Sequence, residues 1–125
     1  MTSGHYNSNA SMQNAAMQPS IVLLEDAVAS LPKRTGAAGS GPVRVVDFGA
    51  SQGANSMQPC KAILDSIRSR ALHQSEGSVT EVEIYHEDLP TNDWGSVLAL
   101  VNDPLTTYVP KVAHHSSVTW RCLSR

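Results

Sequence analysis

An apolar segment that leads straight into a glycine-containing loop constrains the fold of this chain more than any other feature. Residues 43–48 (VRVVDF) precede the loop of residues 49–53 (GASQG), and an amphipathic stretch follows. A nearly continuous apolar run is typical of a strand in a parallel sheet that is covered on both faces. Gly49 and Gly53 let the backbone turn sharply and approach a ligand, and the start of the next helix offers unpaired N–H groups. The pattern predicts a cofactor-binding loop in an α/β fold, with Asp47 at its edge.

The spacing within the loop narrows the class of cofactor. It reads Asp-x-Gly-x-x-x-Gly from Asp47 to Gly53, whereas dinucleotide-binding loops carry Gly-x-Gly-x-x-Gly. The spacing therefore disfavours a pyrophosphate, and with it a nicotinamide-dependent oxidoreductase. It favours a cofactor without phosphates, such as S-adenosylmethionine. An ordinary tight strand-to-helix connection is the alternative interpretation of this loop.

Four stretches of the chain have the apolar periodicity of helices, namely residues 11–18, 20–31, 55–77 and 94–101. Ser20 is a candidate N-cap for the second stretch, and residues 91–93 offer a cap for the last. A second strand is predicted over residues 79–86, where apolar and polar side chains alternate. No clear period is found from Leu105 onward.

The sheet predicted in this way is unfinished. Sheets carry about six strands on average, and an exposed edge beside a strand as apolar as residues 43–48 invites aggregation. We expect either a second chain, as in a homodimer, or a longer polypeptide of which this is the front portion, to complete it. The chain divides into an N-terminal arm with helices and a flexible linker (1–42), a partial cofactor-binding core (43–104), and a tail of uncertain structure (105–125).

Charge and cysteine content exclude several classes of function. The formal net charge is −2 and no basic stripe is evident, so nucleic acid is not expected as a partner. No apolar run is long enough for a membrane span and no signal segment is evident, so we expect a cytoplasmic protein without a membrane partner. Cys60 and Cys122 form no Cys-x-x-Cys pattern, and His114 and His115 are adjacent, so no metal site is expected. Cys60 is predicted to be a core thiol.

Three blocks of residues match the motifs of one known family in order. They are residues 4–13 (GHYNSNASMQ), 47–56 (DFGASQGANS) and 87–94 (EDLPTNDW). The blocks resemble the Tyr-x-x-Asn-Ser-x-x-Gln, Asp-Leu-Gly-Cys-Ser-x-Gly-x-Asn-Ser/Thr and Asn-Asp-Leu-Pro-x-Asn-Asp-Phe motifs of the SABATH methyltransferases. These enzymes use S-adenosylmethionine and mostly methylate carboxyl groups of small metabolites. The resemblance implies an incomplete Rossmann-like class I methyltransferase fold, made of the first strand-helix-strand unit of a parallel sheet with N-terminal helices.

The resemblance also implies binding residues. The substrate carboxylate would be held by Gln13, and the residues expected around the cofactor are Tyr6, Asp47, Gly49, Asn55, Asp88 and Leu89. Asp88 would meet the ribose and Leu89 the adenine. The position of Asp88 at the end of the second strand predicts ribose binding independently, although a simple turn carboxylate would have the same place.

Three further positions also have a structural alternative. Tyr6 would pin the N-terminal arm, Gln13 would be a solvated helix residue, and Leu89 would belong to the core. Two positions depart from the family pattern, because Ala10 stands where Ser is usual and Ala50 stands for Cys. The family's later Gly-Ser-Phe-Tyr segment, aromatic substrate pocket and helical cap have no counterpart in this sequence.

The activity implied by the resemblance is methyl transfer to the carboxyl group of a small-molecule acid. Such an acid, with a pKa near ~4, is already ionised at neutral pH, so no catalytic acid or base is expected. Alignment of the reacting groups would supply roughly 7–11 kcal/mol. The alternative is a non-catalytic, truncated remnant that at most binds S-adenosylmethionine or a full-length relative. Because no lid against water is evident, we expect weak cofactor binding and no turnover by the isolated chain.

Overall fold

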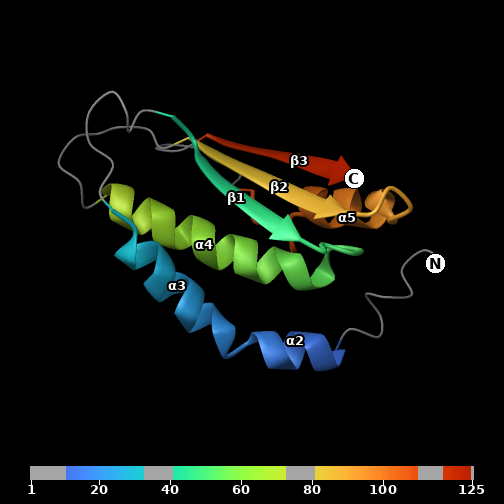
Figure 1. Cartoon of the computed structure of the whole chain (residues 1–125), viewed down its shortest axis with the longest axis horizontal. Coiled ribbons are helices and arrows are strands. Elements are labelled where there is room, and N and C mark those ends of the chain that lie inside the picture. Colours follow the sequence, from blue (N-terminus) through green and yellow to red (C-terminus); the bar gives the residue numbers. More distant parts are fainter. Residues whose placement is uncertain (1–10, 33–40, 73–80, 110–116, 125) are drawn as a thin grey trace.

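Three parallel strands and four helices make up the part of the chain that the computed structural model describes, residues 11–32, 41–72, 81–109 and 117–124. The strands are β1 (Val43–Phe48), β2 (Val82–Asp88) and β3 (Val118–Ser124), in the order β1-β2-β3. The helices are α2 (Ser11–Met17), α3 (Ser20–Ser30), α4 (Ala54–Leu72) and α5 (Trp94–Asn102). The twisted sheet lies over α4, with α3 and α2 below it (Figure 1). This arrangement is the α/β class predicted from the sequence.

The register of the sheet brings the carboxyl ends of β1 and β2 to one edge. Val43 pairs with Val82, and Phe48 pairs with Glu87. Helix α4 connects β1 to β2, and α5 lies between β2 and β3 in the chain. The predicted strand-helix-strand unit is therefore present. In open α/β sheets, ligands bind at the carboxyl ends of the strands, where the loop after β1 and the last residue of β2 meet here.

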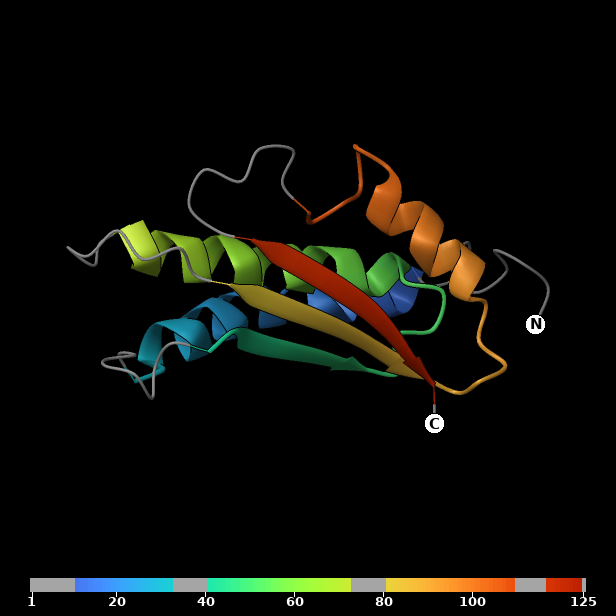
Figure 2. The ribbon, with the colours of Figure 1, turned by 90° about the horizontal axis from the view of Figure 1, so that it is seen from above.

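The hydrophobic core lies on one face of the sheet. Val82 and Ile84 of β2 are fully buried, as the alternation in the sequence predicted. The core residues contributed by the helices are Val28, Met57, Cys60, Leu64, Ile67, Val97 and Val101. Seen from above, α4 runs along the sheet and α5 lies near its β3 side (Figure 2). Leu98 is 42% exposed because it lies one position beyond Val97 and turns away from the sheet.

The helix ends follow local hydrogen bonding. Asp93 caps α5 by accepting a hydrogen bond from the Ser96 amide, as predicted for residues 91–93. Ser20 is not an N-cap, because Pro19 holds that position and the Ser20 hydroxyl donates to the Met17 carbonyl at 2.6 Å. Helix α3 follows α2 so closely that the last carbonyls of α2 are the nearest acceptors. No helix among the described residues is both long and apolar enough to cross a membrane.

The other face of the sheet is largely open in the described part of the chain, contrary to the expectation that residues 43–48 are covered on both faces. Val46 is 44% exposed and Phe48 is 66% exposed. The polar half of this face holds an ion pair between Arg44 and Glu83 at 2.8 Å. An apolar run in a sequence shows that a strand is buried on at least one side, but it does not show what packs on the second side.

A third strand, β3, lies in the tail for which the sequence predicted no period. Its residues Val118, Trp120 and Cys122 pack against the core, while Thr119 and Arg121 point to the open face. This alternation is a strand signal, although it spans only a few residues. Because β3 pairs with β2, it makes β2 the central strand. Most of the flexible linker expected before β1 lies outside the described residues.

Candidate functional site

The loop after β1 is tied to the end of β2 by backbone hydrogen bonds. The amides of Gly49 and Ala50 both donate to the carbonyl of Glu87, at 2.8 and 3.1 Å. The loop turns through three residues with positive φ, Gly49 at +76°, Ser51 at +50° and Gly53 at +90°. Positive φ angles favour glycine, and Ser51 is the non-glycine residue that adopts one here. The turn directs the loop across the end of β2.

Asp88 fixes the same loop through its side chain. Its Oδ2 accepts a hydrogen bond from the Ser51 amide at 2.6 Å, and its Oδ1 accepts one from the Leu89 amide at 2.7 Å. The side-chain amide of Asn92 donates to the Ser51 carbonyl from the other side. The structure thus brings together the Gly49 turn and the Asp88 carboxylate, which are 39 positions apart in the numbering of the chain.

The two glycines of the loop have different surroundings. A Cβ added to Gly49 would meet no atom within 4 Å, so this position leaves open space at the edge of the sheet. A Cβ added to Gly53 would lie 3.3 Å from Cα of Val97 in α5. Gly49 therefore matches the prediction of a backbone that a ligand can approach, whereas Gly53 is explained by the close packing of the loop on α5.

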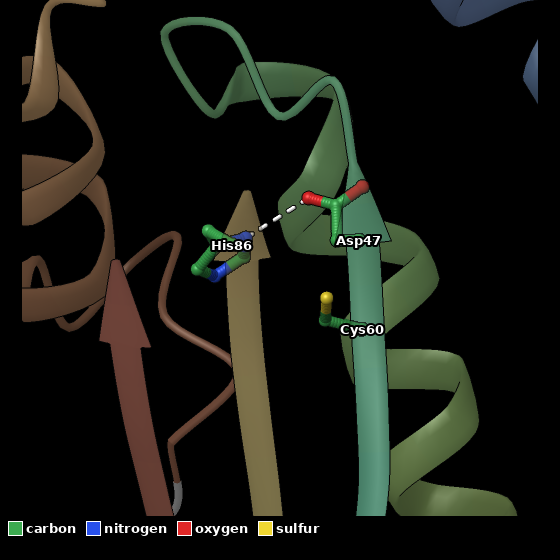
Figure 3. Close-up of side chains that lie close together, drawn as sticks. All are labelled: Asp47, Cys60 and His86. Carbon is green, nitrogen blue, oxygen red and sulfur yellow. Dashed lines mark hydrogen bonds and ion pairs between the residues drawn. The ribbon is translucent and has the colours of Figure 1, made fainter. Parts of the chain in front are cut away.

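Asp47 lies at the end of β1, where its partly exposed side chain belongs to a polar cluster that extends into the core. Its Oδ2 lies 2.9 Å from Nδ1 of His86, and Nε2 of His86 lies 2.8 Å from the Tyr108 hydroxyl. Figure 3 shows Asp47 and His86 facing each other from neighbouring strands, with the Cys60 thiol of α4 beside them. His86 is completely buried. The hydrogen bonds therefore supply partners for a ring that would otherwise be costly to bury.

The cluster perturbs the acidity of its members. Burial raises the pKa of Asp47, but hydrogen bonds from His86 and Ser56 outweigh it and hold the pKa below its usual value. Burial, followed by the charge of Asp47, raises the pKa of the Cys60 thiol to about 12. Burial is also the largest cause that raises the pKa of Tyr108 above its usual value. At neutral pH the cluster accordingly holds one carboxylate, a neutral thiol and a neutral phenol.

Among the described residues, the same cluster contains the three side chains that could hold a metal ion. Ligand atoms of Asp47, Cys60 and His86 lie within 4.8 Å of one another. Both ring nitrogens of His86 already have hydrogen-bond partners, and the thiol pKa keeps Cys60 protonated. A bound cation would have to displace the Cys60 proton and break the contact between Asp47 and His86. Hydrogen bonding accounts for the arrangement without a metal.

The structure describes some of the remaining predicted site residues, which are Asn55, Leu89, Tyr6 and Gln13. Asn55 lies half-buried in the first turn of α4, at the end of the loop. Leu89 is 65% exposed directly after β2, so it does not belong to the core as the structural alternative supposed. Tyr6 lies outside the described residues, and Gln13 lies in α2, where its side chain is outside the description. The roles of Tyr6 and Gln13 stay predictions.

Two residues of the site, His86 and Tyr108, were not predicted from the sequence. His86 follows Val82 and Ile84 at every second position of β2, so the strand alternation places it on the core face. That signal was available, but it does not identify the partners of the ring. Tyr108 lies in a segment after α5 that has no regular period, and it carries no comparable signal.

Comparison with known proteins places this arrangement in a family. A family model described as SAM dependent carboxyl methyltransferase matches residues 2–118. A probable S-adenosylmethionine-dependent methyltransferase of Arabidopsis thaliana is 30% identical over 104 residues, covering 78% of this chain and 29% of that protein. The methyltransferase FUS9 of Gibberella moniliformis is 31% identical over 100 residues, covering 80% of this chain and 24% of that protein.

A solved structure has the same fold. The structure of a loganic acid methyltransferase with SAH superposes with a TM-score of 0.68 and 17% sequence identity, and it covers 94% of this chain and 31% of that chain. At this identity the similarity concerns the fold. The chain thus spans about a quarter to a third of the length of the relatives that it matches, 29%, 24% and 31%.

Proposed function

The chain belongs to the family of S-adenosylmethionine-dependent carboxyl methyltransferases, and on that premise we propose that it binds S-adenosylmethionine at the carboxyl ends of β1 and β2. The acceptor of the methyl group would be the carboxyl group of a small-molecule acid. The single observation that carries the proposal is the meeting of the glycine turn and the Asp88 carboxylate, joined by the hydrogen bond from the Ser51 amide.

The side chains at this edge fit the chemistry of an adenosyl group. A carboxylate can accept about four hydrogen bonds, one at each lone pair. The Asp88 carboxylate accepts two, one from the Ser51 amide and one from the Leu89 amide. Asp88 therefore retains capacity to accept hydrogen bonds from ribose hydroxyls. The exposed side chain of Leu89 offers apolar surface to a base. The open space at Gly49 admits a ligand close to the backbone.

The chemistry of carboxyl methylation asks little of acid or base groups. S-adenosylmethionine would supply an activated methyl group, and the acceptor carboxylate is ionised at neutral pH. The protein's own residues would hold the two reactants in line, the loop and Asp88 on one side and Gln13 on the other. No catalytic proton transfer is assigned to any residue of this chain. Tyr6 and Gln13 are assigned by the family resemblance.

The alternative proposal is a chain that binds the cofactor without turning over substrate. It is supported by the partial coverage of the relatives, of which this chain spans 29% and 24%. It is also supported by the open face of the sheet at Phe48, which is 66% exposed among the described residues. An acceptor site and a cover against water would then have to come from further polypeptide or from a second chain.

Calorimetric titration of the purified chain with S-adenosylhomocysteine tests the proposal. We expect binding by the natural sequence and at least tenfold weaker binding by Asp88→Asn, which loses a charge beside the ribose position. Asp65→Asn is the matched control, because Asp65 is exposed on α4 and pairs with Lys61 at 2.5 Å. Absence of binding by the natural sequence, or equal affinities for the two variants, would refute the proposed site.

A second pair of variants tests the apolar part of the site. Leu89→Ala removes surface next to Asp88, and Leu105→Ala removes a side chain that is 93% exposed elsewhere. We expect weaker binding only for Leu89→Ala. A methyl-transfer assay with small aromatic acids then separates the two proposals, because turnover by the purified chain is incompatible with the non-catalytic alternative.

A further inference from the structure

A buried polar chain crosses the core below the proposed cofactor site. It runs from Asp47 in β1 through His86 in β2 to Tyr108 after α5, with contacts of 2.9 and 2.8 Å. His86 is 0% exposed, and the preceding core-facing residues of its strand, Val82 and Ile84, are aliphatic. An aliphatic residue at position 86 would continue the core without any polar atoms to satisfy. Packing alone therefore does not explain why position 86 is a histidine.

Hydrogen-bond chemistry determines which atoms donate and which accept along Asp47, His86 and Tyr108. An ionised carboxylate only accepts, so Nδ1 of His86 must carry the proton that faces Asp47. In the neutral ring Nε2 is then an acceptor, and the Tyr108 O–H donates to it. Burial raises the pKa of Tyr108, so the hydroxyl keeps its proton for this bond. The Asp47 carboxylate thus selects the Nδ1–H tautomer of His86, and the Tyr108 hydroxyl satisfies that tautomer by donating to Nε2.

Of these three residues, Asp47 is the one that reaches the proposed cofactor site. It lies two positions before Gly49, and its side chain is 26% exposed, whereas that of His86 is not exposed at all. The carboxylate is held from a neighbouring strand by His86, and Ser56 at the start of α4 adds a further hydrogen bond. These two hydrogen bonds hold the carboxylate at the end of β1, where the glycine turn begins.

We propose that His86 and Tyr108 are positioning residues, which fix the Asp47 carboxylate in the single orientation that faces a ligand at the Gly49 turn. This inference rests on the proposed function, because the ligand is the cationic, sulfonium-bearing cofactor proposed there. A carboxylate fixed in advance binds a cation without the entropic cost of being ordered. A purely structural role for His86 makes a different prediction, since its loss would then change stability and leave the affinity of the folded protein unaltered.

Two isosteric substitutions in one background separate these roles. Both are made in a Tyr108→Phe background. The amide nitrogen of Asn is bonded to Cγ, as Nδ1 is in histidine, so His86→Asn keeps an N–H donor at that position. Leucine has the same shape as asparagine but no donor, so His86→Leu removes it. We expect His86→Asn to bind S-adenosylmethionine, which carries the sulfonium charge, within twofold of the background. We expect His86→Leu to bind about tenfold more weakly, a ratio that corresponds to about 1.4 kcal/mol. Equal affinities of the Asn and Leu variants would overturn the positioning role.

The pH dependence of binding gives a readout that a structural role would not move. The groups that face Asp47 in the described structure are His86, Ser56 and the Cys60 thiol, and Cys60 stays protonated below about pH 12. Without the donor of His86, burial favours the protonated form of Asp47. The pH at which affinity is half lost should therefore rise in His86→Leu and stay low in His86→Asn. The same midpoint in both variants would contradict the inference.

Controls keep the proposal separable from misfolding and from the proposed function. Tyr85→Phe removes a tyrosine hydroxyl that bonds Glu83 on the open face of β2, and it should leave affinity unchanged. In the natural chain, long-range ¹H–¹⁵N spectra should show His86 as the Nδ1–H tautomer, and a neutral Nε2–H tautomer would overturn the inference even if His86→Leu failed to fold. Absence of binding by the natural chain would overturn the proposed function and the positioning role together, whereas binding that is indifferent to the Asn and Leu exchange would overturn only the latter.

Discussion

Alanine substitution at the two glycines of the loop after β1 should have unequal effects, although both glycines have the same backbone requirement. Gly49 has φ of +76° and Gly53 has φ of +90°. A side chain in this left-handed region costs roughly 1–2 kcal/mol, so both substitutions should lose at least this much. A Cβ at Gly49 meets nothing within 4 Å, whereas one at Gly53 would lie 3.3 Å from Cα of Val97 and 3.4 Å from the Leu100 side chain.

The contact at Gly53 involves the backbone of helix α5 at the buried residue Val97, which cannot yield as the end of a flexible side chain can. Overpacking of this kind costs about 1–3 kcal/mol. The expected losses in free energy of unfolding are therefore roughly 1–2 kcal/mol for Gly49→Ala and about 2–5 kcal/mol for Gly53→Ala. With a urea dependence of about 2 kcal/mol per molar, the two midpoints should differ by roughly 0.5–1.5 M.

Urea unfolding followed by tryptophan fluorescence measures this difference, because Trp94 and Trp120 both pack against the core. Binding should rank the variants the other way once each is corrected for its folded fraction. Gly49→Ala places a methyl group in the space proposed for the ligand, while Gly53→Ala acts inside the protein. A Gly53→Ala midpoint equal to or above that of Gly49→Ala would refute the account of the loop.

Three further predictions concern stability and reactivity. Asp93→Ala should lower the free energy of unfolding by about 1 kcal/mol, measured with urea, because α5 loses its N-cap bond to the Ser96 amide. Because the pKa of Asp47 is held below its unfolded value of 3.8, its stabilising contribution is complete above that value and is lost as the pH falls through the lower folded pKa. Urea midpoints should therefore fall below about pH 4 in the natural chain and fall less in Asp47→Asn. Cys60 has a thiol pKa of about 12 and is 2% exposed, so it should react with a disulfide reagent only when the protein unfolds. The half-buried Cys122 should react in the native state. Reaction of Cys60 in native Cys122→Ser would contradict this prediction.

The parts of the site that were predicted from the sequence are those written in contiguous motifs. The glycine loop follows β1 directly, Asp88 ends β2 and Leu89 follows it, so local pattern and strand end together place them at one edge. Cys60 was likewise predicted to be a core thiol, and it lies in the core on α4. Such features need only the period of an element and the parallel connection between strands.

The polar cluster could not be predicted in this way. His86 bonds one partner 39 positions earlier and another 22 positions later in the chain. Strand alternation shows that His86 faces inward, but it does not show that the Asp47 carboxylate and the Tyr108 hydroxyl lie on either side of the ring. The third strand was missed for a related reason, since seven residues without flanking turn signals give a weak local pattern.

The sequence by itself determined the family, the α/β class and the edge at which the loop and Asp88 lie, because these depend on short-range order in the backbone and on the parallel register that it imposes. Only the tertiary structure decided which carboxylate supports the loop, which glycine is left free for a ligand and which face of the sheet is open. Those properties depend on side chains that are distant in the chain and meet only once the core has packed. A hydrogen bond of 2.9 Å between two neighbouring strands is a product of that packing.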